Sequence, residues 1–186
     1  MRKIPIEYEN PIDNIILYII QIIAPFFYFL GFTPNILTTI SLLIAIASIY
    51  YFMNDRYYLS AGLIFLAYFF DCFDGFFARS YNMTSVFGDF YDHISDAYKF
   101  IFLLIAMYLK NYDKFKKVVC VFIFFGLLGF IHMGQQEKYY NKNSSLDLLK
   151  MFSINNDHNI MEYTRYLGCG TMILIKVLGI LYYDIK

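Results

Sequence analysis

Long apolar stretches, most of them close to 20 residues, constrain this chain more than any other feature of its 186-residue sequence. A helix of roughly 20 residues crosses the roughly 30 Å hydrocarbon core of a bilayer and satisfies its own backbone hydrogen bonds, as lipid requires. The hydrophobic content of 59% is well above that of an ordinary soluble domain. The sequence therefore predicts an all-α, polytopic membrane protein built as a helix bundle.

The apolar runs predict a bundle of about six helices. Five firm spans cover residues 33–53, 57–79, 86–109, 118–133 and 161–183. Thr33 predicts the cap of the first span and Pro34 its first helical residue. A further run, residues 12–32, contains Asp13, Gln21 and Pro25. This run could form a helix that lies on the membrane surface or one that enters the membrane. We expect an N-terminal segment and juxtamembrane helix over residues 1–32, followed by one membrane domain over residues 33–186.

Two loops are expected between the later spans, a charged one at residues 110–117 and a polar, extramembrane one at residues 135–159. The overall charge argues against a nucleic-acid partner. Lysine plus arginine and aspartate plus glutamate each number 15, which gives no basic surplus.

One part of the apolar sequence combines four aspartates and an arginine with three small residues at fixed spacings. In chain order these are Asp71, Asp74, Gly75, Ala78, Arg79, Gly88, Asp92 and Asp96. Carboxylates at membrane depth are costly, so they mark functional sites. At about 100° per residue, the first five share one helix face, and the last three, spaced by four, stack on one face of the next helix. The short loop at residues 80–85 allows the two faces to converge.

This combination of residue types predicts a divalent-metal site that handles phosphate. Four carboxylates aimed at one small volume repel each other unless cations lie between them. Hard oxygen ligands favour Mg²⁺, Mn²⁺ or Ca²⁺ over zinc. Gly75, Ala78 and Gly88 leave room for a ligand, and the Arg79 guanidinium suits two-pronged binding of a phosphate.

The pattern Asp71-x2-Asp74-Gly75-x2-Ala78-Arg79-x8-Gly88-x3-Asp92-x3-Asp96 resembles the signature of the class I CDP-alcohol phosphotransferases at every position. Pro34-Asn35-x2-Thr38 is also similar to the start of that family's first span. The resemblance covers roughly residues 33–109. It implies metal-dependent transfer of a substituted phosphate from a CDP-alcohol to an acceptor alcohol, with release of CMP, in phospholipid biosynthesis.

The resemblance also implies residue roles. Two divalent ions, Mg²⁺ or Mn²⁺, would be held by Asp71, Asp74, Asp92 and Asp96. The nucleotide would be contacted by Asn35, Thr38, Gly75, Ala78, Arg79, Gly88 and Asp89. For Asp89 a solvated acid favoured by the helix dipole is the alternative. Because CDP-alcohols are cytosolic or inner-leaflet molecules, the active site and the N-terminus would face the cytosol. Members of the family are often dimeric, so a homodimer is a further expectation.

Two residues are candidates for the general base that accepts the proton of the acceptor hydroxyl. Asp96 is the family's usual candidate. His93 corresponds to the base proposed in the choline/ethanolamine phosphotransferase branch, which the segment from Gly88 to Ala97 resembles, and its imidazole suits proton transfer near neutral pH. The alternative for His93 is a packing role, because adjacent helix positions point about 100° apart.

We therefore favour CDP-choline or CDP-ethanolamine with diacylglycerol. The alternative is CDP-diacylglycerol with inositol or a glycerol phosphate. Enzymes of that second group are similarly compact, but they often have a basic residue at the position of Ala97. Lys99 would either neutralise Asp96 or bind an acceptor phosphate, and we favour the first. More remote alternatives are an intramembrane prenyltransferase and a cation transporter.

Overall fold

The computed structural model describes residues 2–140, 147–154 and 158–185, and these residues contain helices and no strand. The long helices are α1 (Pro11–Phe29), α2 (Pro34–Met53), α3 (Tyr57–Ser80), α4 (Val86–Lys110), α5 (Tyr112–Tyr140) and α7 (Cys169–Leu181). The short helical turns are η1 (Asp147–Phe152), η2 (His158–Ile160), α6 (Met161–Thr164), η3 (Arg165–Leu167) and η4 (Tyr182–Asp184). The predicted all-α class is confirmed.

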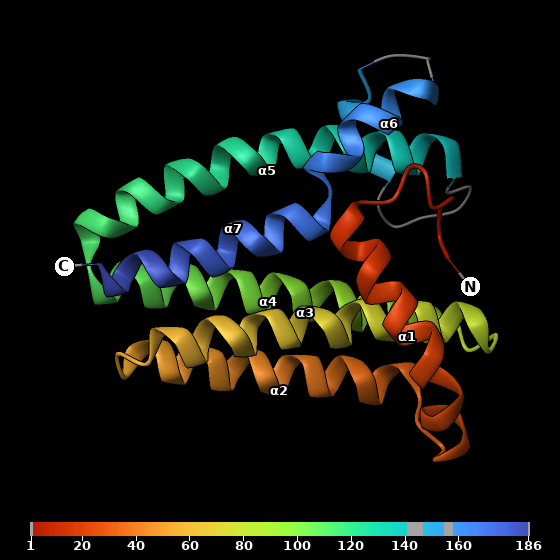
Figure 1. Ribbon diagram of the computed structural model, residues 1–186, viewed down its shortest axis with the longest axis horizontal. Helices are drawn as coiled ribbons and strands as arrows, with labels where there is room; N and C mark the ends of the chain where they lie inside the picture. Colours follow the sequence, from red (N-terminus) through yellow and green to blue (C-terminus); the bar gives the residue numbers. More distant parts are fainter. Residues whose placement is uncertain (1, 141–146, 155–157, 186) are drawn as a thin grey trace.

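The helices α2, α3, α4 and α7 run side by side along the length of the molecule (Figure 1). α3 packs against both α2 and α7, and α4 packs against α2. α1 runs steeply across this direction, near the end of the bundle where α3 gives way to α4 (Figure 1). Thr33 caps α2 and Pro34 is its first residue, as predicted.

Helices α1, α2 and α3 all end in the same way. The residue after each C-cap has a left-handed backbone, at Gly31 (φ 77°), Asp55 (φ 61°) and Asn82 (φ 56°). The next amide then bonds back to a carbonyl five residues earlier, as Met83 N–H does to Ala78 O at 2.9 Å. Glycine and asparagine are the residues that best tolerate this turn. Each turn reverses the chain within a few residues, and after the turn that follows α3 the chain continues as α4, which packs against α2.

Small and hydroxylated residues form the contact between α2 and α3. Ser41 Oγ donates to Ala67 O at 2.8 Å, and Ser48 Oγ donates to Ser60 O at 2.8 Å, both in fully buried positions. Such side chains let two helices approach closely where no water is available to satisfy polar groups. This packing holds the scaffold on which the acidic residues of α3 are presented.

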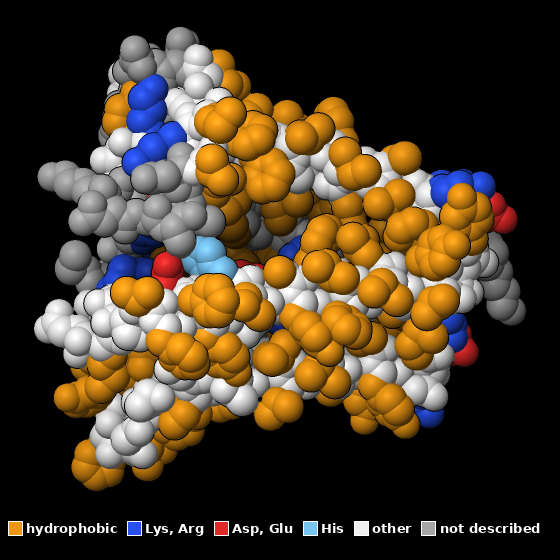
Figure 2. All heavy atoms as spheres, turned by 180° about the vertical axis from the view of Figure 1, so that it is seen from behind, with side chains coloured by type: hydrophobic (Ala, Val, Ile, Leu, Met, Phe, Trp, Pro, Cys, Tyr) orange, Lys and Arg blue, Asp and Glu red, His pale blue; other side chains and the backbone are white. Residues whose placement is uncertain are grey.

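Five of the described segments are long and apolar enough to cross a membrane, namely α1, α2, α3, α5 and the segment Met161–Asp184. α4 is not among them, because its N-terminal half carries the second half of the acidic pattern and Lys99. Hydrophobic side chains cover most of the middle of the molecule, while charged ones show mainly toward its two ends (Figure 2). Among the outward-facing ones, Ile22, Leu43, Phe124 and Leu178 are each more than half exposed, which suits contact with lipid.

The expected loops around the fourth span are wrong in their extent. Only Asn111 separates α4 from α5, and α5 continues to Tyr140. Two lysines of this segment have partners distant in sequence. Lys114 Nζ donates to the carbonyl oxygens of Tyr183 at 3.0 Å and Ile185 at 2.5 Å, and Lys110 pairs with Asp55 at 2.8 Å. At the other end of α5, the buried Glu137 pairs with Lys3 at 2.6 Å. The rest of the expected loop at 135–159 lies partly outside the described residues.

The last span is interrupted, whereas a continuous helix over residues 161–183 was expected. Gly168 is extended (φ −68°, ψ −176°) and separates η3 from α7. The break is fixed by the start of α1. Asn10 Nδ2 donates to Arg165 O at 2.8 Å, and the Asp13 carboxylate accepts from the Gly170 amide at 3.1 Å. The first turn of α7 is thereby held against the first turn of α1.

Candidate active site

The two halves of the acidic pattern meet at one end of the bundle. Ser85 caps α4 by accepting a hydrogen bond from the Gly88 amide at 3.0 Å, only five residues after α3 ends. The capped start and the tight turn after α3 bring α4 back toward α3, where α4 packs against α2 and the side chains of Lys99 on α4 and Asp71 on α3 meet. The convergence of the two faces that the sequence predicts is therefore produced by local turn chemistry.

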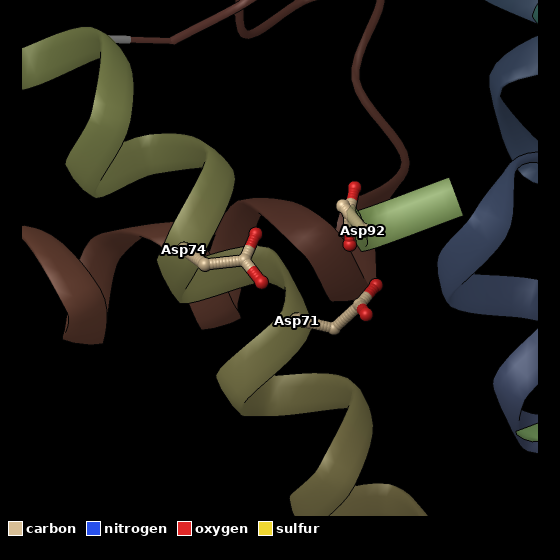
Figure 3. Close-up of side chains that lie close together, drawn as sticks. All are labelled: Asp71, Asp74 and Asp92. Atoms are coloured by element: carbon tan, nitrogen blue, oxygen red, sulfur yellow. The ribbon is translucent and has the colours of Figure 1, made fainter. Parts of the chain in front are cut away.

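Three carboxylates converge there. Asp71, Asp74 and Asp92 each place one oxygen within 4.8 Å of the others, two from α3 and one from α4 (Figure 3). Thr38 of α2 donates a hydrogen bond of 2.6 Å to Asp74 Oδ2 and so fixes that carboxylate. Asp92 Oδ1 is buried and has no hydrogen-bond partner among the residues that the structure describes. A cation ligated by the three carboxylates would satisfy this atom and relieve their repulsion, so the residues fit the predicted divalent metal.

The fourth aspartate of the pattern belongs to a different contact. Asp96, one turn after Asp92, pairs with Lys99 at 2.7 Å, and the same ammonium also contacts Asp71. Lys99 thus lies against the carboxylates, as the neutralising interpretation requires. Asp96 is joined to the other three through this lysine.

A pocket opens beside the three carboxylates, with a volume of about 160 Å³. It contains every residue that the resemblance assigned to the nucleotide: Asn35, Thr38, Gly75, Ala78, Arg79, Gly88 and Asp89. Asp74 and Asp92 complete its acidic side. The structure therefore brings this whole set together around one space, with contributions from α2, α3 and α4.

Close approaches of neighbouring side chains favour glycine at two positions of the pocket. A Cβ on Gly75 would lie 3.2 Å from a guanidinium nitrogen of Arg79. A Cβ on Gly88 would lie 3.0 Å from Ser85 Oγ and 3.1 Å from Asn35 Oδ1. Glycine at these positions lets the Arg79 and Asn35 side chains approach the backbone closely.

His93 lies next to the site. Its Nδ1 is 4.0 Å from Asp89 Oδ1 and 4.0 Å from Asp92 Oδ2, and a third of its side chain is exposed. The pocket is lined by Asp89 and Asp92, and His93, the next residue after Asp92, is not part of the lining. The imidazole is thus close to the carboxylates without sharing the space that the nucleotide residues surround.

The N-terminal segment adds charge near Arg79. Burial raises the pKa of Glu9 to about 7, and the negative charge of Asp13 acts in the same direction. The positive charges of Arg2 and Arg79 act against this rise in the pKa. Glu9 therefore couples the segment before α1 electrostatically to the arginine of the pattern.

One charged residue near the site was missed in the sequence. Lys176 of α7 places its ammonium 5.3 Å from the centre of the Phe100 ring. Phe100 follows Asp96 by four residues, so this lysine faces α4 one turn beyond Asp96. The available signal was a single lysine within an otherwise apolar run, a residue that is costly in a membrane unless it has a function.

Comparison with known proteins agrees with the site. A sequence profile described as CDP-alcohol phosphatidyltransferase matches residues 31–147, more than half of the chain. No curated protein and no solved structure matched the chain. The chain belongs to the CDP-alcohol phosphatidyltransferase family. It is therefore an integral membrane phosphotransferase that transfers a phosphate-containing group from a CDP-alcohol in lipid synthesis.

Proposed function

We propose that this enzyme transfers phosphocholine or phosphoethanolamine from the CDP-alcohol to diacylglycerol in a reaction that requires Mg²⁺ or Mn²⁺ and releases CMP. The observation that carries the proposal is the convergence of Asp71, Asp74 and Asp92 beside the pocket that holds Arg79. A pyrophosphate in this pocket would meet both an arginine and the carboxylates. That is the arrangement needed to hold a CDP group and to let CMP leave.

Asp71, Asp74 and Asp92 are the residues that would hold the divalent ion. When bound, such an ion neutralises phosphate charge and stabilises the departing CMP. The protein itself supplies the positioning. Thr38 orients Asp74, and Arg79 sits where its guanidinium donates to phosphate oxygens without a Cβ at Gly75 to block it.

Asp96 and His93 remain the two candidates to accept the proton of the acceptor hydroxyl. Asp96 is half exposed, at 52%, on the face of α4 that also carries Asp92. His93 lies beside Asp92. The two roles separate by substitution. If His93 is the base, His93→Ala lowers the turnover rate by several powers of ten and leaves CDP-alcohol binding unchanged, whereas a mild loss gives the role to Asp96.

A second candidate function is favoured by Lys176. A lysine that faces α4 one turn beyond Asp96 would suit an acceptor that carries a phosphate, such as a glycerol phosphate, with CDP-diacylglycerol as donor. Lys176→Met would then raise the KM for that acceptor and leave the KM for the CDP-alcohol unchanged. With diacylglycerol as acceptor, the same variant would have little effect.

The cytosolic orientation follows from the chemistry of the substrates. CDP-alcohols reach the protein from the cytosol, so the loop between α3 and α4 and the start of α1 belong on that side. In this arrangement residues 33–186 form the catalytic domain, and residues 1–32 are an N-terminal segment at its cytosolic end. A single cysteine introduced at Thr84, in a chain without its native cysteines, is expected to react with a membrane-impermeant maleimide only from the cytosolic side. Labelling only from the opposite side would reverse the orientation.

The proposal is tested with purified protein in lipid nanodiscs and a panel of CDP-alcohols and acceptors, by following CMP. Release of CMP with CDP-choline or CDP-ethanolamine and diacylglycerol is the expected result. Release with CDP-diacylglycerol and a polar alcohol would replace the favoured substrates by the alternative. Inorganic diphosphate released from a prenyl diphosphate would contradict the reaction class, as would metal-dependent ion uptake into liposomes without any CMP.

Two variants make this assay specific. Asp71→Asn removes one of the three converging carboxylates and is expected to abolish CMP release. Asp55→Asn is the matched control, because Asp55 lies in the turn at the opposite end of the bundle, where it pairs with Lys110 at 2.8 Å. Loss of activity in both variants would point to a general loss of structure rather than to the site.

A further inference from the structure

Lys99 makes an unusual set of contacts for a lysine in a membrane helix. Its ammonium contacts Asp71 Oδ1, lies 2.7 Å from Asp96 Oδ1, and donates to Ser41 Oγ at 3.1 Å. Only 11% of its side chain is exposed. An ammonium group has three protons, so two carboxylates and one hydroxyl occupy all of them.

These contacts place a positive charge between two of the four aspartates of the pattern. Asp71 and Asp96 come from different helices, and each would repel the other without a cation between them. In the structure that cation is the end of the Lys99 side chain. Asp71 is also one of the three residues that converge with Asp74 and Asp92, so it stands between the lysine and the predicted metal position.

The Asp92 carboxylate indicates where a metal ion is still needed. Within the described part of the chain, Asp92 Oδ1 is buried without a hydrogen-bond partner, whereas Asp96 Oδ1 is already satisfied by Lys99. A divalent ion at the three converging carboxylates would supply the missing contact at Asp92. A second divalent ion between Asp71 and Asp96 would lie against the Lys99 ammonium and be repelled by it.

We propose that the Lys99 ammonium group occupies the position between Asp71 and Asp96 where a second divalent ion would otherwise bind. The substrate-free enzyme then binds one divalent ion, at Asp71, Asp74 and Asp92. This inference rests on the metal dependence proposed above, and it replaces the expected two ions by one ion and one ammonium. Lys99 acts here as a positioning residue. It holds Asp96 beside Asp71 and leaves Asp71, Asp74 and Asp92 to bind the ion.

The number of bound ions tests this directly, with Mn²⁺ alone as the probe. Purified wild-type protein is expected to bind one Mn²⁺ and to give the electron paramagnetic resonance signal of an isolated ion. Lys99→Met removes the charge and leaves an unbranched side chain that is one atom shorter. It is expected to bind two Mn²⁺, which at about 3.5–4 Å apart would give a spin-coupled signal.

Lys110→Met is the matched control. Lys110 is on the same helix and pairs with an aspartate, Asp55, but at the opposite end of the bundle. This variant is expected to bind one Mn²⁺ like the wild type. Lys99→Gln serves as a second variant if Lys99→Met fails to fold.

The outcomes separate the two proposals. Two coupled ions in the wild-type protein would overturn the role of Lys99 and leave the metal-dependent function intact. A single ion in both the wild type and a folded Lys99 variant would also overturn it. Absence of any Mn²⁺ binding to the wild type would contradict the proposed metal dependence itself.

Discussion

At the scale of single residues, the site depends on side chains that hold the aspartates as well as on the aspartates themselves. Helical spacing placed Asp71 and Asp74 on one face of α3, and the structure agrees with that prediction. The same spacing says nothing about the partner of each carboxylate. Thr38 and Ser41 come from α2, 36 residues before Asp74 and 58 residues before Lys99, and only the folded bundle brings them to these partners.

Thr38 provides the clearest test of such support. Its hydroxyl donates to Asp74 Oδ2 at 2.6 Å, so Thr38→Val is expected to free that carboxylate and weaken Mn²⁺ binding by about 10-fold or more, with the fold retained. A Mn²⁺ titration measures this. Thr39→Val is the control, because Thr39 donates to Asn35 O at 2.7 Å, away from the three carboxylates. Equal affinity in the two variants would remove Thr38 from the metal site.

Glu9 predicts a pH dependence of stability. Its pKa is raised by burial to about 7 in the folded protein, from 4.5 for an unperturbed glutamate. The folded state therefore favours the protonated acid. The stability that Glu9 contributes is present below pH 4.5 and is lost as the pH rises through about 7.

Glu9→Gln imitates the protonated acid, so the midpoint of thermal unfolding in detergent is expected to fall less between pH 5 and pH 8 than in the wild type. Glu7→Gln is the matched control, at an exposed position two residues away. The account of Glu9 is contradicted if the wild type and both variants show the same slope against pH.

At the scale of elements, the sequence predicted helices better than it predicted their ends. The caps of α2 and the tight loop between α3 and α4 are encoded locally, in Thr33, Pro34 and Ser85, and they could be inferred. The start of α5 could not, because Lys114, one of the lysines that suggested a loop, is satisfied by carbonyl groups about 70 residues later in the chain. Asn10 and Asp13 likewise hold the break before α7 through partners more than 150 residues away.

The contact between α1 and α7 leads to a prediction at Gly170. A Cβ at this position would lie 2.5 Å from Asn10 Oδ1, 2.7 Å from Asp13 Oδ1 and 2.9 Å from Ile12 Cβ. Gly170→Ala is therefore expected to destabilise the protein by about 1–3 kcal/mol, seen as a lower midpoint of thermal unfolding.

Gly62→Ala is the control for this substitution. Gly62 is also helical, in α3, and a Cβ there would meet nothing within 4 Å. Because alanine is the better helix former, this variant is expected to be as stable as the wild type or slightly more stable. If Gly170→Ala is tolerated as well as Gly62→Ala, α1 does not pack on α7 as described.

At the scale of the whole molecule, an apolar bundle concentrates its polar chemistry at one end. α2, α3 and α4 supply the pocket and the converging carboxylates, and α1 crosses the bundle at the same end (Figure 1). The family could be inferred from the spacing of eight residues. The substrates could not, because the residues that would select an acceptor, such as Lys176, lie outside that pattern.

The dependence of CMP release on a divalent ion bound by the three carboxylates tests the central claim most directly. The protein is treated with a chelator, returned to chelator-free buffer and assayed with CDP-alcohol and acceptor while Mn²⁺ is added back. The account predicts no CMP without Mn²⁺, full recovery with Mn²⁺ in the wild type, and no recovery in Asp92→Asn at any Mn²⁺ concentration. CMP release that persists in the chelated protein, or that Asp92→Asn supports at the wild-type rate, would contradict it.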